Sequence, residues 1–317
     1  MSSKRTARGQ HPNGMVRVAG IDITHPDKIW WPESGITKLD VARYYADIAA
    51  YMLPWITDHP LTAERCPDGL GGTCFYQKDF PEQTDGLTTH GIQSESARKI
   101  IHYAIGSKTT VLALVNLGCI AVHVMNCRIG SLDRPDWLAF DLDPSSEEFS
   151  DAATAAGVLR RVLEEFHLTS FPKTSGGRGI HVLIPLQRSS DQEQVRTFAH
   201  CVSREVAIRV PKLVTVHMSK SKRRGRVFAD WLRNAFGQTI ASPYSVRCRP
   251  GCPVSAPLGW DEVDPHLDPS TFNLQTIERR IGSKNPWAKF WDHPQALPHL
   301  DSCPKVGKGR PTVGTHL

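Results

Sequence analysis

Two aspartates one residue apart, Asp141 and Asp143, follow an apolar stretch that begins at Trp137. If this stretch is a strand, its side chains alternate between two faces, so both carboxylates point to one side and Leu142 points to the other. Two carboxylates this close repel each other, and hard divalent cations such as Mg²⁺ and Mn²⁺ relieve the repulsion because they take oxygen ligands. The spacing therefore favours a metal site at the end of a strand, with an ordinary turn capped by aspartate as the alternative.

A glycine-rich segment, TSGGRGIH at residues 174–181, brings together groups that bind phosphate. Its glycines allow successive backbone N–H groups to face one point, which makes an anion-binding nest. No Gly-Lys-Ser/Thr follows, so the segment is not a P-loop, and a plain hairpin turn is the alternative interpretation. The residues predicted to hold phosphates here are Lys173, Ser175, Gly176, Gly177 and His181.

A third carboxylate, Asp230, lies between Ala229 and Trp231 in a strand-like segment that follows the basic run KSKRRGR at residues 220–226. A charged side chain among apolar neighbours needs a partner, and an ion pair with Arg233 would supply one. Alternatively, the three aspartates together hold two metal ions, one activating an attacking 3′-hydroxyl and one holding a triphosphate. The nearby cations would then neutralise the charge that develops on the phosphates.

Hydrophobic periodicity predicts the elements that position these residues. Their order mixes hairpin and crossover connections, which favours an α+β fold over a doubly wound α/β fold. The predicted helices are 39–52, 151–166 (capped by Ser150 or Asp151) and 192–209. The predicted strands are 137–141, one on each side of the glycine-rich turn, and 226–232, with a short strand or loop at 74–80. The stretch 111–125 is too apolar to be assigned.

The composition is typical of a globular enzyme outside the membrane. The chain has 317 residues, 40% hydrophobic and 22% charged, with a net charge of +6, and no apolar run approaches the ~20 residues that span a bilayer. The polar, basic N-terminus lacks the apolar stretch of a secretory signal. We expect flexible tails at residues 1–14 and 299–317 around a folded part at 15–298. The eight cysteines form no zinc pattern, so free thiols in a reducing compartment are expected.

Four segments, FDLDP, TSGGRGIH, FADWLRN and PYSVR, occur in this order along the chain. Together they resemble the polymerase domain of bacterial ligase D, a branch of the archaeo-eukaryotic primase superfamily, and the resemblance covers nearly all of the predicted folded part. It implies a primase-polymerase fold, in which a mixed or antiparallel, RRM-like catalytic sheet is flanked by helices. A smaller N-terminal α/β lobe would form the other side of one active-site cleft.

The resemblance also implies roles for individual residues, position by position. The matching residues form three groups, which would bind the metal ions, the incoming nucleotide and the DNA. The first group matches the metal ligands Asp141, Asp143 and Asp230, with His123 as an active-site histidine. The second group matches the nucleotide contacts Ser175, His181, Arg223, Arg233, Thr239 and Arg247. The third group matches lysines that hold a downstream 5′-phosphate, Lys28 and Lys38, and aromatics that stack on template bases, Phe75 and Tyr76, with Lys78 beside them.

By resemblance, the chain is expected to be a DNA-dependent polymerase that extends 3′ ends and fills short gaps in non-homologous end joining. It would use two divalent ions, Mn²⁺ or Mg²⁺, and nucleoside triphosphates, with ribonucleotides preferred. The sequence shows no ligase or phosphoesterase domain, so a stand-alone form is expected, in the cytoplasm at the nucleoid and without a membrane partner. Its partners would be gapped or broken DNA with a 5′-phosphate, Ku, and a separate ATP-dependent DNA ligase.

Two other functions share the predicted metal site. One is a primase or primase-polymerase that starts chains without a primer, in replication or damage tolerance. The other is a glycosyltransferase, in which the paired aspartates bind Mn²⁺ with a nucleotide sugar. A glycosyltransferase would give no role to Asp230 or to the basic run at residues 220–226.

Overall fold

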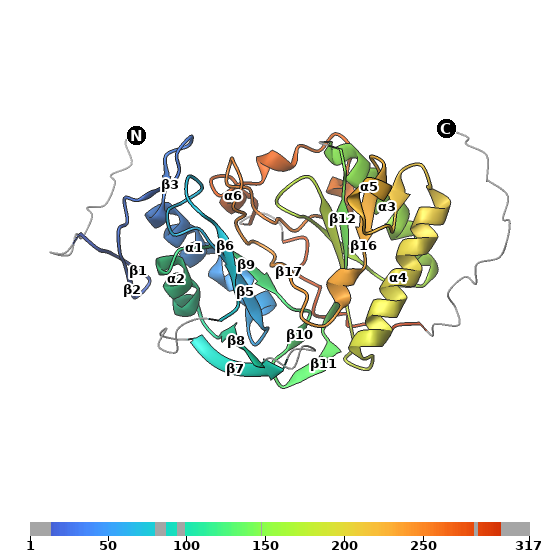
Figure 1. Cartoon of the computed structure of the whole chain (residues 1–317), viewed down its shortest axis with the longest axis horizontal. Coiled ribbons are helices and arrows are strands. Elements are labelled where there is room, and N and C mark those ends of the chain that lie inside the picture. Colours follow the sequence, from blue (N-terminus) through green and yellow to red (C-terminus); the bar gives the residue numbers. More distant parts are fainter. Residues whose placement is uncertain (1–13, 80–86, 94–98, 147, 282–284, 299–317) are drawn as a thin grey trace.

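Two lobes make up the described part of the chain, which comprises residues 14–79, 87–93, 99–146, 148–281 and 285–298. In the computed structural model, the N-terminal lobe packs two helices against a four-stranded sheet, and the second lobe covers a five-stranded sheet with two long helices (Figure 1). The predicted α+β fold with mixed and antiparallel sheets is confirmed. The predicted tails at 1–14 and 299–317 lie outside the described residues, apart from Gly14.

The five-stranded sheet carries the aspartates. All its neighbouring strands are antiparallel except the last pair, which is parallel. Helices α3 (Phe149–Glu165) and α4 (Gln192–Arg209) cover one face, where alternate residues of the central strand join their core. In spatial order the strands are β13 (Phe171–Thr174), β14 (Ile180–Pro185), β12 (Trp137–Asp143), β16 (Val227–Asp230) and β15 (Val214–Thr215).

The sheet of the N-terminal lobe is antiparallel throughout. Helix α1 (Lys38–Ile56) begins at a capping box, in which Thr37 and Asp40 each bond the other's backbone N–H, and it packs beside α2 (Lys108–Asn116). In spatial order the strands are β17 (Ile240–Ala241), β9 (Cys119–Val124), β5 (Leu61–Arg65) and β6 (Phe75–Gln77).

Short hairpins and turns complete the described elements. The two-stranded pairs are β1 (Val16–Val18) with β2 (Ile21–Ile23), β3 (Ile29–Trp31) with β4 (Ile36–Thr37), β7 (Leu87–Gln93) with β8 (Lys99–Ile105), and β10 (Cys127–Arg128) with β11 (Ser131–Pro135). The short helices are α5 (Lys220–Arg223), η1 (Leu232–Asn234), η2 (Trp260–Glu262), η3 (Pro269–Thr271) and α6 (Ile277–Ile281).

The helix predictions are confirmed in type, with differences at their ends. α4 has the predicted bounds, whereas α1 continues past Pro54 because Trp55 and Ile56 are buried. The predicted caps of α3 are wrong: Glu148 is the N-cap, without a side-chain bond, and the Asp151 carboxylate instead accepts from the Ser146 hydroxyl at 2.9 Å. The unassigned stretch 111–125 holds the end of α2, a turn, and all of β9.

A continuous hydrophobic core joins the two lobes. Trp137 and Leu183, on the face of the five-stranded sheet away from α3 and α4, belong to the same buried cluster as the N-terminal helices. Near the end of the described chain, Trp287 and Phe290 pack edge-on against Trp55 of α1. These contacts fix how the two sheets face each other. None of the helices in the described residues is long and apolar enough to cross a membrane.

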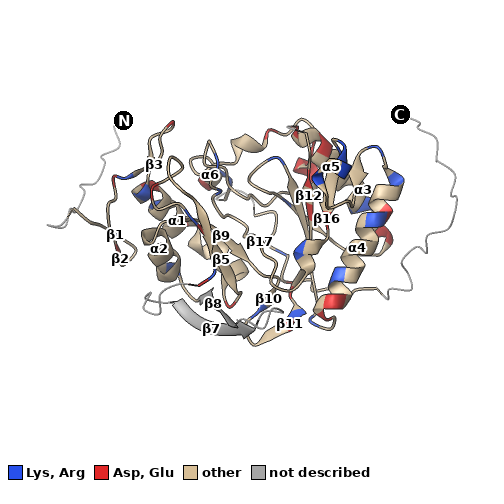
Figure 2. Ribbon diagram, in the orientation of Figure 1, with Lys and Arg blue, Asp and Glu red and all other residues tan. Residues whose placement is uncertain are grey.

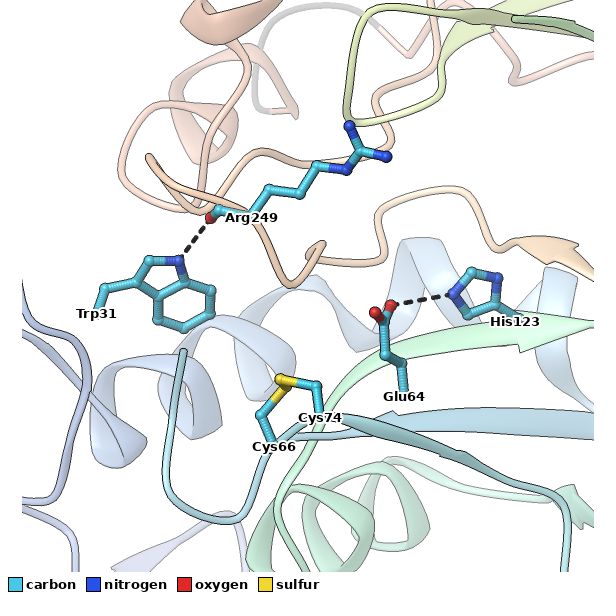
Figure 3. Close-up of a disulfide and its surroundings, with 6 residues drawn as sticks. All are labelled: Trp31, Glu64, Cys66, Cys74, His123 and Arg249. Carbon is cyan, nitrogen blue, oxygen red and sulfur yellow. Dashed lines mark hydrogen bonds and ion pairs between the residues drawn. A yellow bond between two sulfur atoms is a disulfide. The ribbon is translucent and has the colours of Figure 1, made fainter. Parts of the chain in front are cut away.

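Disulfide bonding departs from the sequence prediction. Cys66 and Cys74 form a disulfide between the end of β5 and the start of β6 (Figure 3). The expectation of free thiols is therefore wrong for this pair, because the loop between them brings their Cα atoms to 4.3 Å. It is also wrong for Cys201, which is disulfide-bonded. Of the described cysteines, Cys119, Cys127, Cys248 and Cys252 are free.

Candidate active site

Four side chains form a row across the five-stranded sheet. Lys173 pairs with His181, His181 with Asp141, and Asp141 with Asp230 in the registers of neighbouring strands. Directly opposed residues of paired strands point to one face, roughly 5 Å apart, so the four groups share the face that α3 and α4 leave uncovered. Asp143 lies two residues further along β12 on that face, while the intervening leucine is buried with the helices. The predicted alternation is confirmed.

Hydrogen bonds and ion pairs connect the row. The Lys173 ammonium lies 2.7 Å from Nδ1 of His181, and Nε2 of His181 lies 3.4 Å from Oδ1 of Asp141. Nε of Arg233 lies 3.2 Å from Oδ2 of Asp141 and 3.2 Å from Oδ2 of Asp230. The ion pair considered for Asp230 is thus present, and the same guanidinium bridges both aspartates.

The charged groups in this row shift one another's pKa values. Burial would raise the pKa of Asp141, but His181 and Arg233 outweigh burial and hold that pKa well below its usual range. Burial, assisted by the charge of Lys173, lowers the pKa of His181 to about 3. His181 is therefore neutral at neutral pH, so the hydrogen bond from its Nε2–H and the charge of Arg233 keep Asp141 ionised.

Asp143 and Asp230 carry negative charge that the protein neutralises only in part. Burial and the Asp141 carboxylate raise the pKa of Asp143, and burial raises the pKa of Asp230 although Arg233 opposes it. In Figure 2 the ribbon is red, for acidic residues, on β12 and β16, beside the basic helix α5. From α5, Nη1 of Arg223 lies 3.3 Å from Oδ2 of Asp143. Carboxylates concentrated in this way favour the binding of a further cation.

The three aspartates suit a divalent ion by donor type, but arginines engage them in this structure. Oxygen donors on one face of a sheet match the ligands of Mg²⁺ and Mn²⁺. Among the described residues, however, no three His, Cys, Asp or Glu side chains converge on a point that could hold a metal. Since Arg233 bridges Asp141 and Asp230, a metal ion between these carboxylates would require the guanidinium to move aside. Metal binding therefore stays a prediction.

The glycine-rich turn between β13 and β14 packs closely against later parts of the chain. Gly176 has φ +71°, which favours glycine, and a Cβ there would lie 2.4 Å from Cγ of Arg247. Oγ of Ser175 accepts from the Gly179 N–H at 3.1 Å, and the Arg247 guanidinium donates to the Ser175 carbonyl. At Gly177, a Cβ would come within 2.9 Å of Arg249. These contacts bring cations to the turn, as a phosphate site needs.

Gly179 lies so close to β12 that any side chain would disturb the site. A Cβ at this position would be 2.6 Å from the carbonyl oxygen of Leu142, the residue between the two aspartates. We expect Gly179→Ala to destabilise the protein by about 1–3 kcal/mol, because backbone must move to accept the methyl group. Gly157→Ala, in open space on α3, should leave stability unchanged or raise it slightly. Urea unfolding of both variants checks this, and equal stabilities would contradict the close approach.

A cavity of about 330 Å³ lies between the two sheets. Predicted site residues from both lobes meet in its lining, although they are far apart in sequence. They are Tyr76, Lys78, His123, Asp141, His181, Arg233, Thr239 and Arg247, and Thr62, Ile240 and Ala241 complete the described lining. Lys173 lies behind His181, while Asp143 and Arg223 pair beside the lining residues.

Phe75 and Tyr76, the predicted base-stacking pair, are unusually exposed for large apolar side chains, at 42% and 63%. The Tyr76 ring meets the ring of His123 edge-on, with centroids 5.6 Å apart. The exposed ring of Tyr76 therefore lines the cavity on the side of β6, whereas Phe75, the preceding residue of the strand, lies on the other face of the sheet under Arg65.

The two predicted phosphate-holding lysines lie near β3 and the start of α1, apart from β12 (Figure 1). The ammonium of Lys38 is buried and donates to the backbone and side-chain oxygens of Asn116 at 2.8 and 2.9 Å. Lys28 pairs with Asp68. Burial, followed by the charge of Lys28, lowers the pKa of Lys38 to about 8. The two cations are thus neighbours, and Lys28 is the more accessible one.

Sequence reasoning missed three side chains that support the site. Asn234 is fully buried and exchanges two hydrogen bonds with the backbone of β12, at 2.7 and 2.9 Å. Ser255 accepts a hydrogen bond from Lys173. Oε2 of Glu64 lies 3.5 Å from Nε2 of His123. Only Asn234 belongs to one of the segments quoted above, FADWLRN. Ser255 and Glu64 could not be found from the sequence, because only the fold brings them next to Lys173 and His123.

Comparison with known proteins agrees with this arrangement. Residues 37–287 match the family described as LigD, primase-polymerase domain. The chain is 32% identical over 280 residues to the multifunctional non-homologous end joining protein LigD of Pseudomonas aeruginosa, across 86% of this chain and 33% of that protein. It is also 32% identical over 281 residues to the bifunctional non-homologous end joining protein LigD of Bacillus subtilis, across 88% of this chain and 45% of that protein.

A solved structure matches as well. The polymerase domain of Mycobacterium tuberculosis ligase D, in complex with DNA, aligns with a TM-score of 0.80 and 28% sequence identity, across 87% of this chain and 99% of that domain. The chain thus spans less than half the length of the two LigD relatives and nearly all of the solved domain. Because the family match covers most of the chain and the fold agrees, this chain belongs to the family of LigD primase-polymerase domains.

Proposed function

We propose that the chain is a metal-dependent nucleotidyltransferase that extends DNA 3′ ends and fills short gaps in non-homologous end joining. The observation that supports this most is the row Lys173–His181–Asp141–Asp230, which borders a cavity lined by cations from both lobes. The cavity volume lies within the range of small-molecule sites. The LigD relatives are named for end joining, and the solved neighbour is a polymerase domain in complex with DNA.

In this proposal, Asp141, Asp143 and Asp230 hold two divalent ions, Mn²⁺ or Mg²⁺, which would stabilise charge on the attacking and leaving oxygens. The 3′-oxygen of the primer forms a bond to the α-phosphorus of a nucleoside triphosphate, and the bond to the leaving pyrophosphate breaks. Arg233 and Arg247, which both line the cavity, lie where positive charge would stabilise the triphosphate. Release of Arg233 from the two aspartates would free the carboxylates for metal and the guanidinium for phosphate.

The DNA side of the proposal uses the N-terminal lobe. The exposed rings of Phe75 and Tyr76 suit stacking on template bases, which does not depend on sequence. Lysine suits a terminal phosphate because its ammonium is a compact point charge, and Lys28 is accessible enough to meet one. A preference for ribonucleotides, and partnership with Ku and a separate ATP-dependent ligase, belong to the proposal through the family alone.

The experiment that tests this function is primer extension on a duplex with a short gap, with Mn²⁺, comparing a 5′-phosphate with a 5′-hydroxyl at the downstream end. We expect extension to be stimulated by the 5′-phosphate, and Lys28→Ala to reduce that stimulation about tenfold, as for loss of a charge-assisted hydrogen bond. Lys108→Ala, an exposed lysine on α2 in the same lobe, is the matched control.

The outcomes separate the candidate functions. Equal stimulation in wild type and Lys28→Ala would remove the support for gap filling through this lysine. New chains on unprimed template, without use of gapped DNA, would show that the chemistry is nucleotidyl transfer and the task is priming. Absence of product in both assays would contradict the proposed chemistry.

A further inference from the structure

The disulfide between Cys66 and Cys74 closes the loop 67–73, which joins β5 to β6. Inside cells, thiols are generally kept reduced, and the disulfides that form there are mostly transient, catalytic or redox-sensing. DNA end joining, proposed above, takes place in such a compartment, and its chemistry gives this disulfide no task. The contacts of the closed loop therefore indicate what the disulfide controls.

Loop 67–73 packs on the segment that carries Lys28. The backbone N–H of Leu70 donates to the Trp30 carbonyl at 2.8 Å. From the same loop, Oδ1 of Asp68 lies 2.5 Å from the Lys28 ammonium. Asp68 therefore occupies the accessible lysine to which the proposed function assigns a downstream 5′-phosphate, so that carboxylate and phosphate compete for one cation.

The Lys28 side of this contact is fixed by the rest of the lobe. Trp30 of β3 is fully buried, and the indole N–H of Trp31 donates to the carbonyl of Arg249 at 2.7 Å (Figure 3). The disulfide, in contrast, ties down the side of the contact that carries the carboxylate. When the loop is opened, the carboxylate moves and the backbone of the lysine stays in place.

The ion pair between Asp68 and Lys28 depends on the closed loop. Their side chains are 73% and 38% exposed, and an ion pair this exposed adds little by itself. A closed loop has few conformations, so it keeps the carboxylate at the lysine at small entropic cost. An open loop has more conformations, and a terminal phosphate, which carries up to about two negative charges, then competes better for the ammonium.

The two cysteines of the disulfide differ in their access to solvent. Cys66 is fully buried, whereas Cys74 is exposed and lines a cavity of about 550 Å³ together with Trp31 and Leu70. Sγ of Cys74 is therefore the atom that a thiolate from solvent attacks. Cys248 lines the same cavity, but burial raises the pKa of its thiol, so it stays protonated and is a poor nucleophile towards the disulfide.

We infer that the Cys66–Cys74 disulfide is a redox switch for recognition of the downstream 5′-phosphate. In the oxidised protein, the closed loop holds Asp68 on Lys28 and weakens the response to the phosphate. In the reduced protein, the open loop releases Lys28 for the phosphate. This inference rests on the proposed function, because that function places the phosphate at Lys28.

The reductant of this switch is a dithiol. One of its thiolates forms a bond to Sγ of Cys74, the bond between the two protein sulfurs breaks, and Cys66 leaves as a thiolate that takes up a proton. The second thiolate of the reductant then attacks the reductant sulfur bound to Cys74, so that Cys74 leaves and is protonated in turn. Two electrons pass to the protein, the dithiol becomes a disulfide, and its two protons end on the two cysteines. Oxidation is the reverse exchange with a disulfide.

The test is binding of a gapped duplex that carries either a 5′-hydroxyl or a 5′-phosphate at the downstream end, followed by fluorescence anisotropy. The Kd for the hydroxyl form divided by the Kd for the phosphate form measures phosphate recognition, with the protein either oxidised or reduced by dithiothreitol. Reduction should raise this ratio roughly threefold to fivefold, as for release of one exposed ion pair. Asp68→Asn should give the higher ratio in both redox states, and Asp47→Asn, at an exposed position on α1, should respond like wild type.

Cysteine variants identify the disulfide that is responsible, because reduction also opens the disulfide of Cys201. Cys74→Ser should show the ratio of the reduced protein in both redox states, whereas Cys201→Ser should keep the redox response. The Asp68→Asn measurement keeps both cysteines of the switch in place, so it tests the inference even if a serine variant does not fold.

Each outcome decides the inference. A redox response that is present in wild type and absent in Asp68→Asn supports it. The same ratio in oxidised and reduced wild type overturns it, and so does a response that persists in Asp68→Asn, because that response would act through β6 rather than through Lys28. In both of these cases the reduced protein still prefers the 5′-phosphate, so the proposed function stands. No preference for the phosphate in either redox state would overturn the inference together with the phosphate role of Lys28.

Discussion

Asp141→Asn is expected to reduce nucleotide addition about a thousandfold or more while DNA affinity stays close to that of wild type. Asparagine keeps the shape of the side chain but removes the charge that lies between His181 and Arg233 and beside Asp230 of the neighbouring strand β16. A bound metal ion contributes several kcal/mol to transition-state stabilisation, and each 1.36 kcal/mol is tenfold in rate. Single-turnover addition, with DNA binding followed by fluorescence anisotropy, measures both quantities.

The control for this variant is Asp47→Asn, which changes an exposed aspartate on α1. It should match wild type in both measurements. Retention of more than a tenth of the activity by Asp141→Asn would contradict the assignment of Asp141 as a metal ligand.

Lys173→Met is expected to lower kcat/KM for the nucleotide by roughly tenfold to a hundredfold without lowering the melting temperature. Lys173 is fully buried and holds His181 through Nδ1, so its loss lets that ring move out of line with Asp141, and small misplacements are costly in catalysis. Burial, and after it the charge of Arg247, lowers the pKa of Lys173. Replacing a buried cation by an apolar side chain of similar length removes that desolvation penalty.

Thermal unfolding and steady-state kinetics on the same preparations test the two halves of this prediction. Lys212→Met, at an exposed position between α4 and β15, should change neither the melting temperature nor kcat/KM. A large fall in melting temperature for Lys173→Met would show that the ammonium supports the fold rather than the site, and unchanged kinetics would show that it supports neither His181 nor substrate.

Local pattern was enough to predict the central strand and its two aspartates. Alternation along β12 is a property of the strand itself, so the side on which Asp141 and Asp143 lie could be read from three residues. The same holds for α4, whose bounds follow from its own periodicity and capping residues. The short, uniformly apolar stretch 111–125 could not be divided in this way, because both a buried helix and a buried strand lack a polar face there.

Interactions between distant segments could not be predicted from one sequence. Glu64 meets His123 only because β5 pairs with β9, and Asn234 bonds to β12 only because the turn after β16 folds back. The bridge that Arg233 makes between Asp141 and Asp230 depends on strand register. From the sequence, only the ion pair between Arg233 and Asp230 could be considered. The Cys66–Cys74 disulfide depends on the path of the loop between them, which composition does not specify.

The pairing of β12 with β14 and β16 also limits how the length of this chain can vary. Because the site is assembled by backbone register, one residue inserted into or deleted from the middle of β12 would turn every later side chain of that strand to the opposite face. Leu142 would then face the cavity and Asp141 would face the cores of α3 and α4. Single substitutions alter the chemistry one group at a time, whereas a change of length inside this sheet removes all of it in one step. Tolerated insertions and deletions should therefore be confined to the connections between strands.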